Sequence, residues 1–581
     1  MRPLIFFFFI SYTALGQLSI VGDNYIFVED NFIFVTDNVN LQQADSKLYL
    51  RNDAQLLQGT GTTGNLGSGQ LSVYQRGTTH NYAYNYWCSP VGNNLTSGNE
   101  NFRANLIDDA TGLLTSNDVT FINYDGTSSP LVIASYWIYT FENSEFYSDW
   151  VYRGDIGTIA PGLGFTMKGT SGSSNSQLYD FRGKPNNGTI TNTVMADVWT
   201  LIGNPYPSSL DAMAFIHDTD NSAAITGTLY YWEQDLTVFS HYIADYVGGY
   251  ATYTINSAGT VETFIPATFD TYNSDGSLNT VGSSSTSGKQ AQRYIPVGQG
   301  FMVEGSNPTT GIVRTTNAHR EYYPQSGAQS VFFRNADSNA NAFTETITDY
   351  HTVPNDYKRF RLNIDFNDLY TRQLVQTFHD TEATINFDYG LESKSPNDVA
   401  NDAYWIVENE PFIAQALPLD INTTKIPIIF KLETQQNLRV RIADIQHFDD
   451  NQPVFLHDKE TDSYANLRNN FFEINLPQGI YNTRFEIVFV NDSALSVSEF
   501  ENDDVLLYQD NYSNLLNILN PNYKEVISVT IYDLLGKKII ANEYKGVKSS
   551  YTINTKGLST GTYIVHVFAE QKWITKKIII K

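Results

Sequence analysis

The sequence has a single cysteine, Cys88, in 581 residues, and this scarcity excludes two kinds of site. One thiol cannot close an intramolecular disulfide, and without a second cysteine it does not build a thiolate zinc site. The surrounding residues, Tyr86-Trp87-Cys88-Ser89-Pro90, are typical of the end of a buried strand. We therefore expect an inert core thiol, in a protein that burial alone stabilises in an oxidising compartment.

Long hydrophobic runs are also missing. The longest, over residues 4–10, is far shorter than the about 20 apolar residues of a membrane helix. It follows Arg2 and precedes small residues, which predicts a signal peptide over residues 1–16 with cleavage between Gly16 and Gln17. We expect no integral membrane segment in the mature chain.

Signatures of common active sites are absent from the sequence. It has no His-Glu-x-x-His, no Gly-x-Ser-x-Gly, no P-loop and no Gly-x-Gly-x-x-Gly opening a helix, and its nine histidines form no i, i+2 or i, i+4 pair. The sequence therefore predicts no catalytic residue and no cofactor, and favours a non-enzymatic role. A glycosidase-type carboxylate pair stays open, because sequence does not show the distance between two acids. The places for it are Glu382, Asp388 and the cluster Tyr230-Tyr231-Trp232-Glu233.

Basic residues are few: 36 Lys and Arg stand against 62 Asp and Glu, for a net charge of −26. Such a chain repels nucleic acid, so we expect no nucleic-acid partner, and we interpret the charge mainly as solubility. Residues 511–581 differ, because ten Lys and four acidic residues give them a net charge of +6, which leaves −32 for residues 1–510. The change of sign predicts a boundary within an acidic linker over residues 491–510.

Aromatic residues are abundant, at 14% of the chain against 17% charged residues. Together with an apolar–polar alternation of period two, they predict an all-β, multi-domain protein. Residues 17–81 begin with a repeat of period seven, Tyr25–Asn31 followed by Phe32–Asn38. Its β-branched and aromatic residues favour short stacked strands, as in a β-solenoid or meander, over a helical heptad.

A second repeat has a much longer period. Its copies are Pro161–Gly169 and Gly300–Gly305, each with an upstream partner, Tyr86–Gly92 and Trp199–Pro207. They predict two related strand-rich units, over residues 82–189 and 190–345. Duplication favours a scaffold, and the alternative is that one copy keeps a site that the other has lost.

Two further elements are expected between residues 190 and 490. A short helix is predicted over Ser209–Ile216, with Ser208 or Ser209 as its N-cap. Residues 346–490 are predicted to form a β-sandwich. The alternating stretches that predict it are Phe360–Ile364, Ile428–Leu432, Leu438–Ile442 and Arg484–Phe489.

Four motifs lie together at the C-terminal end: Asn517–Pro521, Val529–Lys538, Leu558–Val567 and Lys576–Lys581. In this order they resemble the type A sorting domain of type IX secretion system cargo in Bacteroidetes. The resemblance implies an Ig-like β-sandwich over residues 511–581 that is recognised by the type IX machinery. It also implies Sec export to the periplasm and translocation across the outer membrane, so that the protein is secreted or held at the cell surface. The residues that match the motifs are Asn520, Pro521, Asp533, Gly536, Lys537, Gly561, Tyr563, Lys576 and Lys577.

Parts of the preceding chain resemble large flavobacterial surface proteins of uncharacterised function. The stretches that carry this resemblance are Trp199–Pro207, Gly300–Gly305, Phe412–Pro418, Val454–Asp458 and Gly479–Phe485. In the linker, Asp492-Ser493-Ala494 is similar to an O-glycosylation acceptor of the same phylum.

Two kinds of binding site are candidates. Asp218, Asp220 and Asn221 place oxygen ligands close together, as calcium requires, although they lack the Gly and distal Glu of a twelve-residue loop and also suit a solvated turn. Exposed aromatic rings on which sugars stack are the second candidate, with buried packing as the alternative. The stretches that offer such rings are Tyr82, Tyr84, Tyr86 and Trp87, or Tyr230, Tyr231 and Trp232.

The function we expect is that of an adhesive or structural cell-surface protein that binds surface glycans or other cells. One alternative is a secreted glycan-active hydrolase with an unrecognised carboxylate pair. Another is a carbohydrate-binding protein that calcium stabilises.

Overall fold

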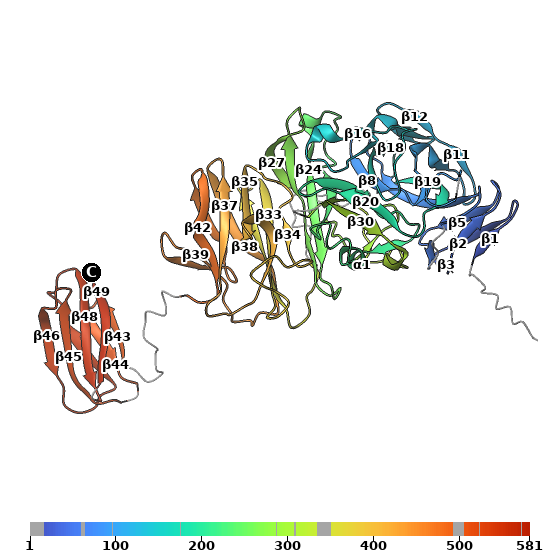
Figure 1. Cartoon of the computed structure of the whole chain (residues 1–581). Helices are drawn as coiled ribbons and strands as arrows, with labels where there is room; N and C mark the ends of the chain where they lie inside the picture. Colours follow the sequence, from blue (N-terminus) through green and yellow to red (C-terminus); the bar gives the residue numbers. More distant parts are fainter. Residues whose placement is uncertain are drawn as a thin grey trace, which may run out of the picture. The chain divides into compact units, whose positions relative to one another are not determined.

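A computed structural model describes residues 17–581 except 60–63, 96, 175, 286, 307–309, 334–349, 492–504, 522 and 571. The described residues are almost entirely β-strand and form two compact units, residues 1–490 and residues 491–581 (Figure 1). The prediction of an all-β, multi-domain protein is confirmed. The finer division proposed within residues 1–490 stays a prediction, and the signal peptide lies outside the described residues.

Helical segments are short throughout the described part of the chain. They are α1 (Ala212–Ile216) and single 3-10 turns at Ala104–Leu106, Ser135–Trp137, Tyr147–Asp149, Ile243–Asp245 and Asn317–His319. Among the described residues, no helix has the length and apolar character needed to cross a bilayer.

The N-terminal strands form a small parallel stack, which confirms the solenoid prediction. The strands are β1 (Leu18–Ile20), β2 (Tyr25–Glu29), β3 (Phe32–Val35), β4 (Val39–Leu41), β5 (Lys47–Arg51), β6 (Gln55–Gln58) and β7 (Gln70–Thr78). β1 pairs with β4, β2 with β5 and β3 with β6, all in parallel, and β5 also pairs in parallel with β7. Tyr25 lies beside Lys47, so one turn takes 22 residues, and the sequence period of seven is one side of that turn.

The next strands belong to the first predicted repeat. They are β8 (Tyr84–Cys88), β9 (Val91–Gly92), β10 (Ile107–Ala110), β11 (Ser116–Asp118), β12 (Thr120–Ile122), β13 (Gly126–Ser128), β14 (Leu131–Ala134), β15 (Tyr139–Thr140), β16 (Val151–Tyr152), β17 (Gly164–Lys168), β18 (Thr170–Ser171) and β19 (Ser176–Pro185). The long antiparallel pair of β19 with β7 joins this repeat to the parallel stack.

The second predicted repeat, over residues 190–345, contains several longer strands. Its elements besides α1 are β20 (Ile190–Val194), β21 (Trp199–Gly203), β22 (Ser209–Asp211), β23 (Leu229–Gln234), β24 (Val247–Ile255), β25 (Glu262–Ile265), β26 (Thr268–Tyr272), β27 (Leu278–Ser284), β28 (Tyr294–Ile295), β29 (Gly300–Glu304), β30 (Gly311–Thr315) and β31 (Arg320–Glu321).

The two repeats meet through equivalent strands. In the first, Gly164 of β17 lies opposite Cys88 of β8, and in the second, Gly300 of β29 lies opposite Gly203 of β21. Each copy also bonds to the other, because the Cys88 amide donates to the Gly298 carbonyl at 3.0 Å and the Gly203 amide donates to the Gly162 carbonyl at 3.2 Å. One hydrophobic core runs through the stack and both repeats.

The helix α1 begins later than the sequence predicts. Ser209 and Asp211 belong to β22, which pairs with β28 and β31. The N-cap of α1 is Asp211, whose Oδ1 accepts a hydrogen bond from the Met213 amide at 3.0 Å, so the expectation of Ser208 or Ser209 as the cap is wrong. Strand pairing with distant segments fixes residues 209–211, and sequence alone does not show it.

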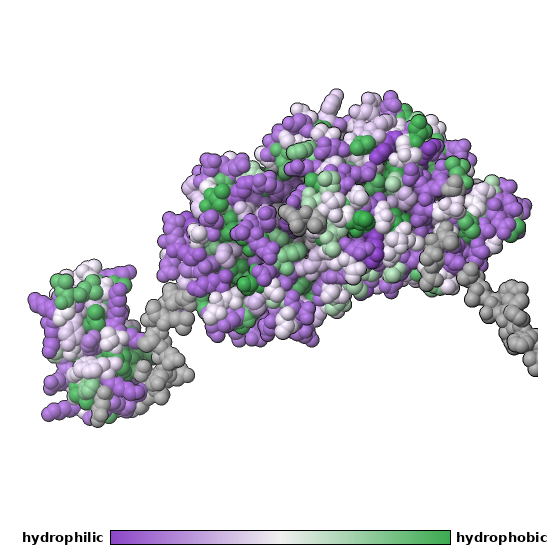
Figure 2. Space-filling model, in the orientation of Figure 1, coloured by the Kyte–Doolittle hydropathy of each residue, from purple (hydrophilic) through white to green (hydrophobic). Residues whose placement is uncertain are grey.

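The last part of the first unit, for which the sequence predicts a β-sandwich, is an eleven-stranded sheet. Its strands are β32 (Lys358–Phe366), β33 (Tyr370–Phe378), β34 (Ser393–Lys394), β35 (Asn401–Val407), β36 (Glu410–Leu417), β37 (Lys425–Leu432), β38 (Gln436–Gln446), β39 (Phe455–Asp458), β40 (Ser463–Asn466), β41 (Phe472–Leu476) and β42 (Gly479–Val488). β35 pairs with both β36 and β37, so one continuous sheet bends over its own core. On the face of the first unit that Figure 2 shows, hydrophilic residues dominate and hydrophobic ones lie in small, separate areas.

The second unit is a seven-stranded sandwich with its own core. Its strands are β43 (Leu506–Asp510), β44 (Leu515–Leu519), β45 (Val526–Asp533), β46 (Lys538–Glu543), β47 (Ser550–Asn554), β48 (Gly561–Ala569) and β49 (Lys572–Ile580). Val505 is part of this core and β43 pairs with β44, so the sandwich begins at residue 505. The predicted linker, which extended to residue 510, was therefore too long at its C-terminal end.

Candidate functional site

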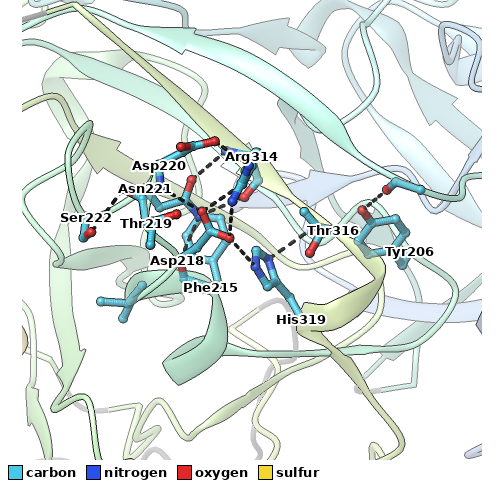
Figure 3. Close-up of polar contacts among 12 residues, drawn as sticks. Tyr206, Phe215, Asp218, Thr219, Asp220, Asn221, Ser222, Arg314, Thr316 and His319 are labelled. Atoms are coloured by element: carbon cyan, nitrogen blue, oxygen red, sulfur yellow. Dashed lines mark hydrogen bonds and ion pairs between the residues drawn. The ribbon is translucent and has the colours of Figure 1, made fainter. Parts of the chain in front are cut away.

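The candidate calcium residues lie just after α1, and the structure pairs them with cations of the protein (Figure 3). The Asp218 carboxylate accepts hydrogen bonds from Nε and Nη2 of Arg314, at 2.8 and 3.1 Å, and contacts Nε2 of His319 at 3.0 Å. Asp220 forms a second ion pair with Arg314. Although burial alone would raise it, these bonds hold the pKa of Asp218 below its ordinary value.

Asn221 has a structural role in the same turn. It is fully buried, its Nδ2 donates to the carbonyls of Phe215 and Arg314, both at 2.8 Å, and its Oδ1 accepts from the Arg314 amide at 2.7 Å. Asn221 thus ties α1 to β30. Among the described residues, no three or more His, Cys, Asp or Glu side chains lie together so that they could hold a metal ion. Calcium binding here stays a prediction.

The candidate acids Glu382 and Asp388 lie on a surface segment between β33 and β34. Glu382 is exposed. The Asp388 carboxylate accepts from the Thr384 amide at 2.6 Å and from the Thr384 hydroxyl at 3.0 Å, which closes a tight turn. This geometry explains Asp388 as a turn residue.

The two candidate aromatic stretches come together at the junction of the repeats. Tyr86 of β8 stacks on Trp232 of β23, with ring centroids 6.3 Å apart and planes at 14°, and its hydroxyl lies 2.8 Å from that of Tyr250. Tyr86, Trp87, Tyr230 and Tyr231 are buried, so these four do not form a sugar platform. Tyr82, Tyr84 and Trp232 are half-buried.

Beside this junction lies a cavity of about 70 Å³, here named the Trp232 cavity. β29 pairs with β23 at Tyr230, and the residues that follow in β23, Trp232, Glu233 and Gln234, all line the cavity. The Gln234 side chain fixes the opposite wall, because it bonds to the Tyr84 amide at 3.3 Å and the Tyr82 carbonyl at 3.2 Å. The lining includes Thr78, Tyr84, Trp232, Glu233, Asp235 and Thr237.

Glu233 is the acid that the sequence placed beside the aromatic cluster, and it is buried in this wall. Its Oε2 accepts hydrogen bonds from the hydroxyls of Ser285, at 2.9 Å, and Ser287. Burial raises the pKa of Glu233, while Lys289 and the two hydroxyls act in the opposite direction. Glu233 is thus a buried acid next to open space.

A row of partly exposed rings lies next to the cavity, and sequence reasoning missed most of it. The aromatic row consists of Phe239, Tyr82, His241, Tyr124, Tyr136 and Tyr152, whose successive ring centroids are 5.9, 4.6, 6.4, 5.0 and 6.4 Å apart. Phe239 is 71% exposed, Tyr124 49%, Tyr136 41% and Tyr152 53%. These rings come from five segments of both predicted repeats. The run Tyr136-Trp137-Ile138-Tyr139 was the one local signal for it.

A buried lysine supports the middle of this row. The Lys168 ammonium lies 3.7 Å from the centre of the Trp137 ring and 4.7 Å from that of Tyr84, and contacts Nδ1 of His241 at 3.0 Å. Nε2 of His241 is 3.1 Å from Asp125. Burial lowers the pKa of Lys168 to about 7, against a smaller opposite effect of Asp125.

Cys88 is buried, as predicted, and burial raises the pKa of its thiol. Of the predicted cleavage site, Gln17 is exposed at the start of the described chain and Gly16 lies outside it. The Asp492-Ser493-Ala494 acceptor also lies outside the described residues.

In the second unit, the motif residues build turns and core. Asn520 is buried, and its Nδ2 donates to the carbonyls of Lys524 and Lys548, both at 2.8 Å. Asp533 accepts from the amides of Leu535 and Lys537 at 2.9 Å, in a turn where Gly536 has a φ of +79°. The remaining motif residues are Pro521 after β44, Gly561 and Tyr563 in β48, and Lys576 and Lys577 in β49.

Comparison with known families assigns both units. A family model described as "Secretion system C-terminal sorting domain" matches residues 512–581, and a model described as "Domain of unknown function (DUF8693)" matches residues 10–489. No curated protein matches the chain. A solved chain described as "Biofilm associated protein - BSP domain" is 9% identical over 88% of this chain and 96% of that one, with a TM-score of 0.11, too low to support an argument.

The sorting-domain match makes the protein a type IX secretion cargo, exported across the outer membrane to the cell surface or the extracellular space. The other match covers most of the remaining chain, and the protein therefore belongs to the family described as Domain of unknown function (DUF8693).

Proposed function

We propose that this exported protein is a non-enzymatic adhesin that binds polysaccharide along the aromatic row. The observation that carries the proposal is the exposure of Phe239, Tyr124, Tyr136 and Tyr152 in one continuous series of rings. Tyrosine combines an apolar ring face with a polar hydroxyl at its edge. Sugars present C–H groups that can stack on such a face and hydroxyls that can bond at its edge.

The row is also held in place before any ligand arrives. Trp137 is buried beneath it and donates from its indole nitrogen to the Tyr124 carbonyl at 2.9 Å. Lys168 and Asp125 hold the two nitrogens of the His241 ring. Rings that are already ordered lose little conformational entropy on binding.

A glycan array with the mature chain tests the proposal. We expect binding to extended polysaccharides and at least a tenfold loss, equal to about 1.4 kcal/mol, in the double variant Tyr136→Ala, Tyr152→Ala. Tyr25→Ala is the matched control, because Tyr25 is 54% exposed but lies in the parallel stack. Equal binding by both variants, or no glycan binding by the unmodified protein, would refute the proposal.

A secreted glycan hydrolase is the second candidate, and Glu233 favours it. A general acid at neutral pH needs a raised pKa, which burial gives Glu233 beside a cavity that Asp235 also lines. Release of reducing ends from a polysaccharide panel, abolished by Glu233→Gln, would establish it. The same array with and without calcium distinguishes the third possibility, a carbohydrate-binding protein that calcium stabilises.

A further inference from the structure

We propose that the Trp232 cavity is a binding pocket for one terminal, uncharged sugar residue of the glycan that lies on the aromatic row. The inference rests on the proposed function, since it assigns the end of the same ligand. It concerns a separate set of residues, at the junction of β8 and β23, and is tested separately.

The cavity wall includes residues with unpaired hydrogen-bonding groups. The indole nitrogen of Trp232 is buried and has no hydrogen-bond partner among the described residues. Oε1 of Glu233 is also buried and accepts no hydrogen bond of normal geometry there. Buried polar atoms are nearly always paired, and leaving one unpaired costs about 1–3 kcal/mol. Trp232 and Glu233 both line the cavity, so a hydroxyl-bearing ligand has an unpaired donor and an unpaired acceptor among its lining residues.

The size of the cavity and the residues that line it suit a small polyol. The cavity of about 70 Å³ exceeds several times the ~10–15 Å³ that one water needs. Its wall combines the rings of Tyr84, Trp232 and Phe333 with the hydroxyls of Thr78 and Ser287. Rings for stacking and a few polar groups for orientation are what a small polyol requires.

Acidic side chains outnumber basic ones in the cavity wall. The cavity is lined by two acids, Glu233 and Asp235, and one base, Lys289, whose ammonium donates to the Phe333 carbonyl at 3.1 Å. An anionic sugar would bring a third carboxyl group into a wall that holds a single ammonium group. The pocket therefore favours neutral sugars over uronic acids.

The lining of the cavity is connected to the aromatic row by side-chain contacts. Tyr84 lines the cavity and lies 6.1 Å, ring to ring, from the buried Trp137. Leu236 also lines it, and its carbonyl contacts Nε2 of His80 at 2.9 Å. The His80 ring packs on Phe239 at the end of the row, with centroids 5.0 Å apart. A chain lying along the row would thus reach the cavity with its last residue.

Titration of the full mature chain with single sugars tests this pocket apart from the row. The probes are glucose, N-acetylglucosamine and glucuronate, each up to about 50 mM, with binding followed by calorimetry and ligand-observed NMR. We expect saturable binding of at least one neutral sugar and none of glucuronate. No binding of either neutral sugar, or equal binding of glucuronate, would overturn the proposal.

Two variants localise the binding. Trp232→Phe keeps a ring and removes the unpaired N–H, and Thr237→Trp places a large side chain at the exposed lining residue Thr237. We expect each to weaken binding at least tenfold. The removed N–H has no protein partner among the described residues, but the smaller ring also loses packing on Tyr86, so the unfolding temperature of Trp232→Phe is measured beside its sugar affinity. Unaltered sugar affinity in both variants would overturn the pocket.

The control is Trp199→Phe, because Trp199 packs on Tyr230 at 4.3 Å, within the same aromatic cluster but outside the cavity lining. It should keep full sugar affinity. The row variant Tyr136→Ala, Tyr152→Ala should also bind single sugars normally. If the row variant binds single sugars normally and also binds the glycan array as well as the unmodified protein does, the adhesin proposal fails and the pocket proposal stands. If the array responds and single sugars do not bind, the pocket fails alone.

Discussion

A Cβ atom built on Gly203 would lie 2.5 Å from the Cβ of Cys88. The two residues hold equivalent places in β21 and β8 and meet where the repeats join. The same added atom would also lie 2.4 Å from the carbonyl oxygen of Gln299. Real Cβ atoms do not come this close to backbone, so the junction needs a residue without a side chain at position 203.

Gly203→Ala should therefore destabilise the first unit. The strand cannot shift without breaking the bonds between the repeats, so we expect the free energy of unfolding to fall by about 1–3 kcal/mol. Urea unfolding of the mature chain measures it. Gly479→Ala is the control, because the nearest atom to its Cβ would be 3.5 Å away. Equal stability of the two variants would show that the junction is not tightly packed.

Lys168 makes the stability of the first unit depend on pH. Burial lowers its pKa from 10.5 to about 7, so between these values the unfolded chain binds more protons than the folded one. The contribution of Lys168 to the free energy of unfolding therefore rises with pH from about 7 towards 10, at up to about 1.4 kcal/mol per pH unit.

The contribution of Lys168 is obtained by measuring the free energy of unfolding of the unmodified protein and of Lys168→Met at pH 6.5, 8 and 9. The difference between them should move in favour of the unmodified protein as pH rises. Buried acids such as Asp270, whose pKa burial raises to about 7, are present in both proteins, so their pH-dependent contributions cancel when the two free energies of unfolding are subtracted. Parallel curves for Lys168→Met would contradict the assignment.

Asp218→Asn should destabilise the turn after α1 because Arg314 and His319 lose their carboxylate. We expect a loss of about 1–3 kcal/mol in the free energy of unfolding at neutral pH. Because the folded-state pKa of Asp218 is below its ordinary value, its contribution is present above pH 4 and disappears on acidification.

Asp220→Asn is the control for Asp218, because its side chain is 54% exposed and it shares only Arg314, so the loss should be smaller. Both measurements are repeated with calcium and with a chelator. The same loss in both conditions is expected if Asp218 acts through its ion pairs. Stabilisation by calcium that disappears in Asp218→Asn would establish a cation site instead.

The C-terminal unit should fold alone from residue 505. A fragment of residues 505–581 contains the complete core, whereas residues 511–581 lack Val505 and strand β43. We expect the longer fragment to unfold cooperatively and the shorter one to melt at a lower temperature, as followed by circular dichroism. Identical melting curves would place the boundary at residue 511.

Deletion of residues 505–581 should leave the remaining chain folded in the periplasm, because the two units have separate cores. Cell fractionation measures this, and proteolysis of the retained protein checks its fold. Normal appearance of the shortened protein outside the cell would contradict the role of the sorting unit.

Local patterns in the sequence predicted the fold better than the site. Alternation gave the strands, and the seven-residue period matched one side of a turn of the parallel stack. The charge change placed the second unit correctly but missed β43, because Leu506 and Leu507 lie within an acidic stretch. The cap of α1 was missed because pairing of β22 decides where the helix begins.

The candidate site could not be predicted in full because its parts are far apart in the chain. Tyr86 and Trp232 were both named, but only folding places one ring on the other. The wall of the Trp232 cavity extends from Thr78 to Phe333. Nothing local distinguishes a tyrosine of the exposed row from one in the core, since burial depends on which strand covers it.

The parallel stack of β1 to β7 also has a modular consequence. Every turn pairs with the next one at the usual strand spacing of about 4.8 Å, so the number of turns sets the length of this segment. Antiparallel β19 covers β7 at one side, whereas growth at the side of β1, β2 and β3 would disturb no later contact within the stack. Whole turns can therefore be added at the N-terminal end of the stack without displacing the strands that follow.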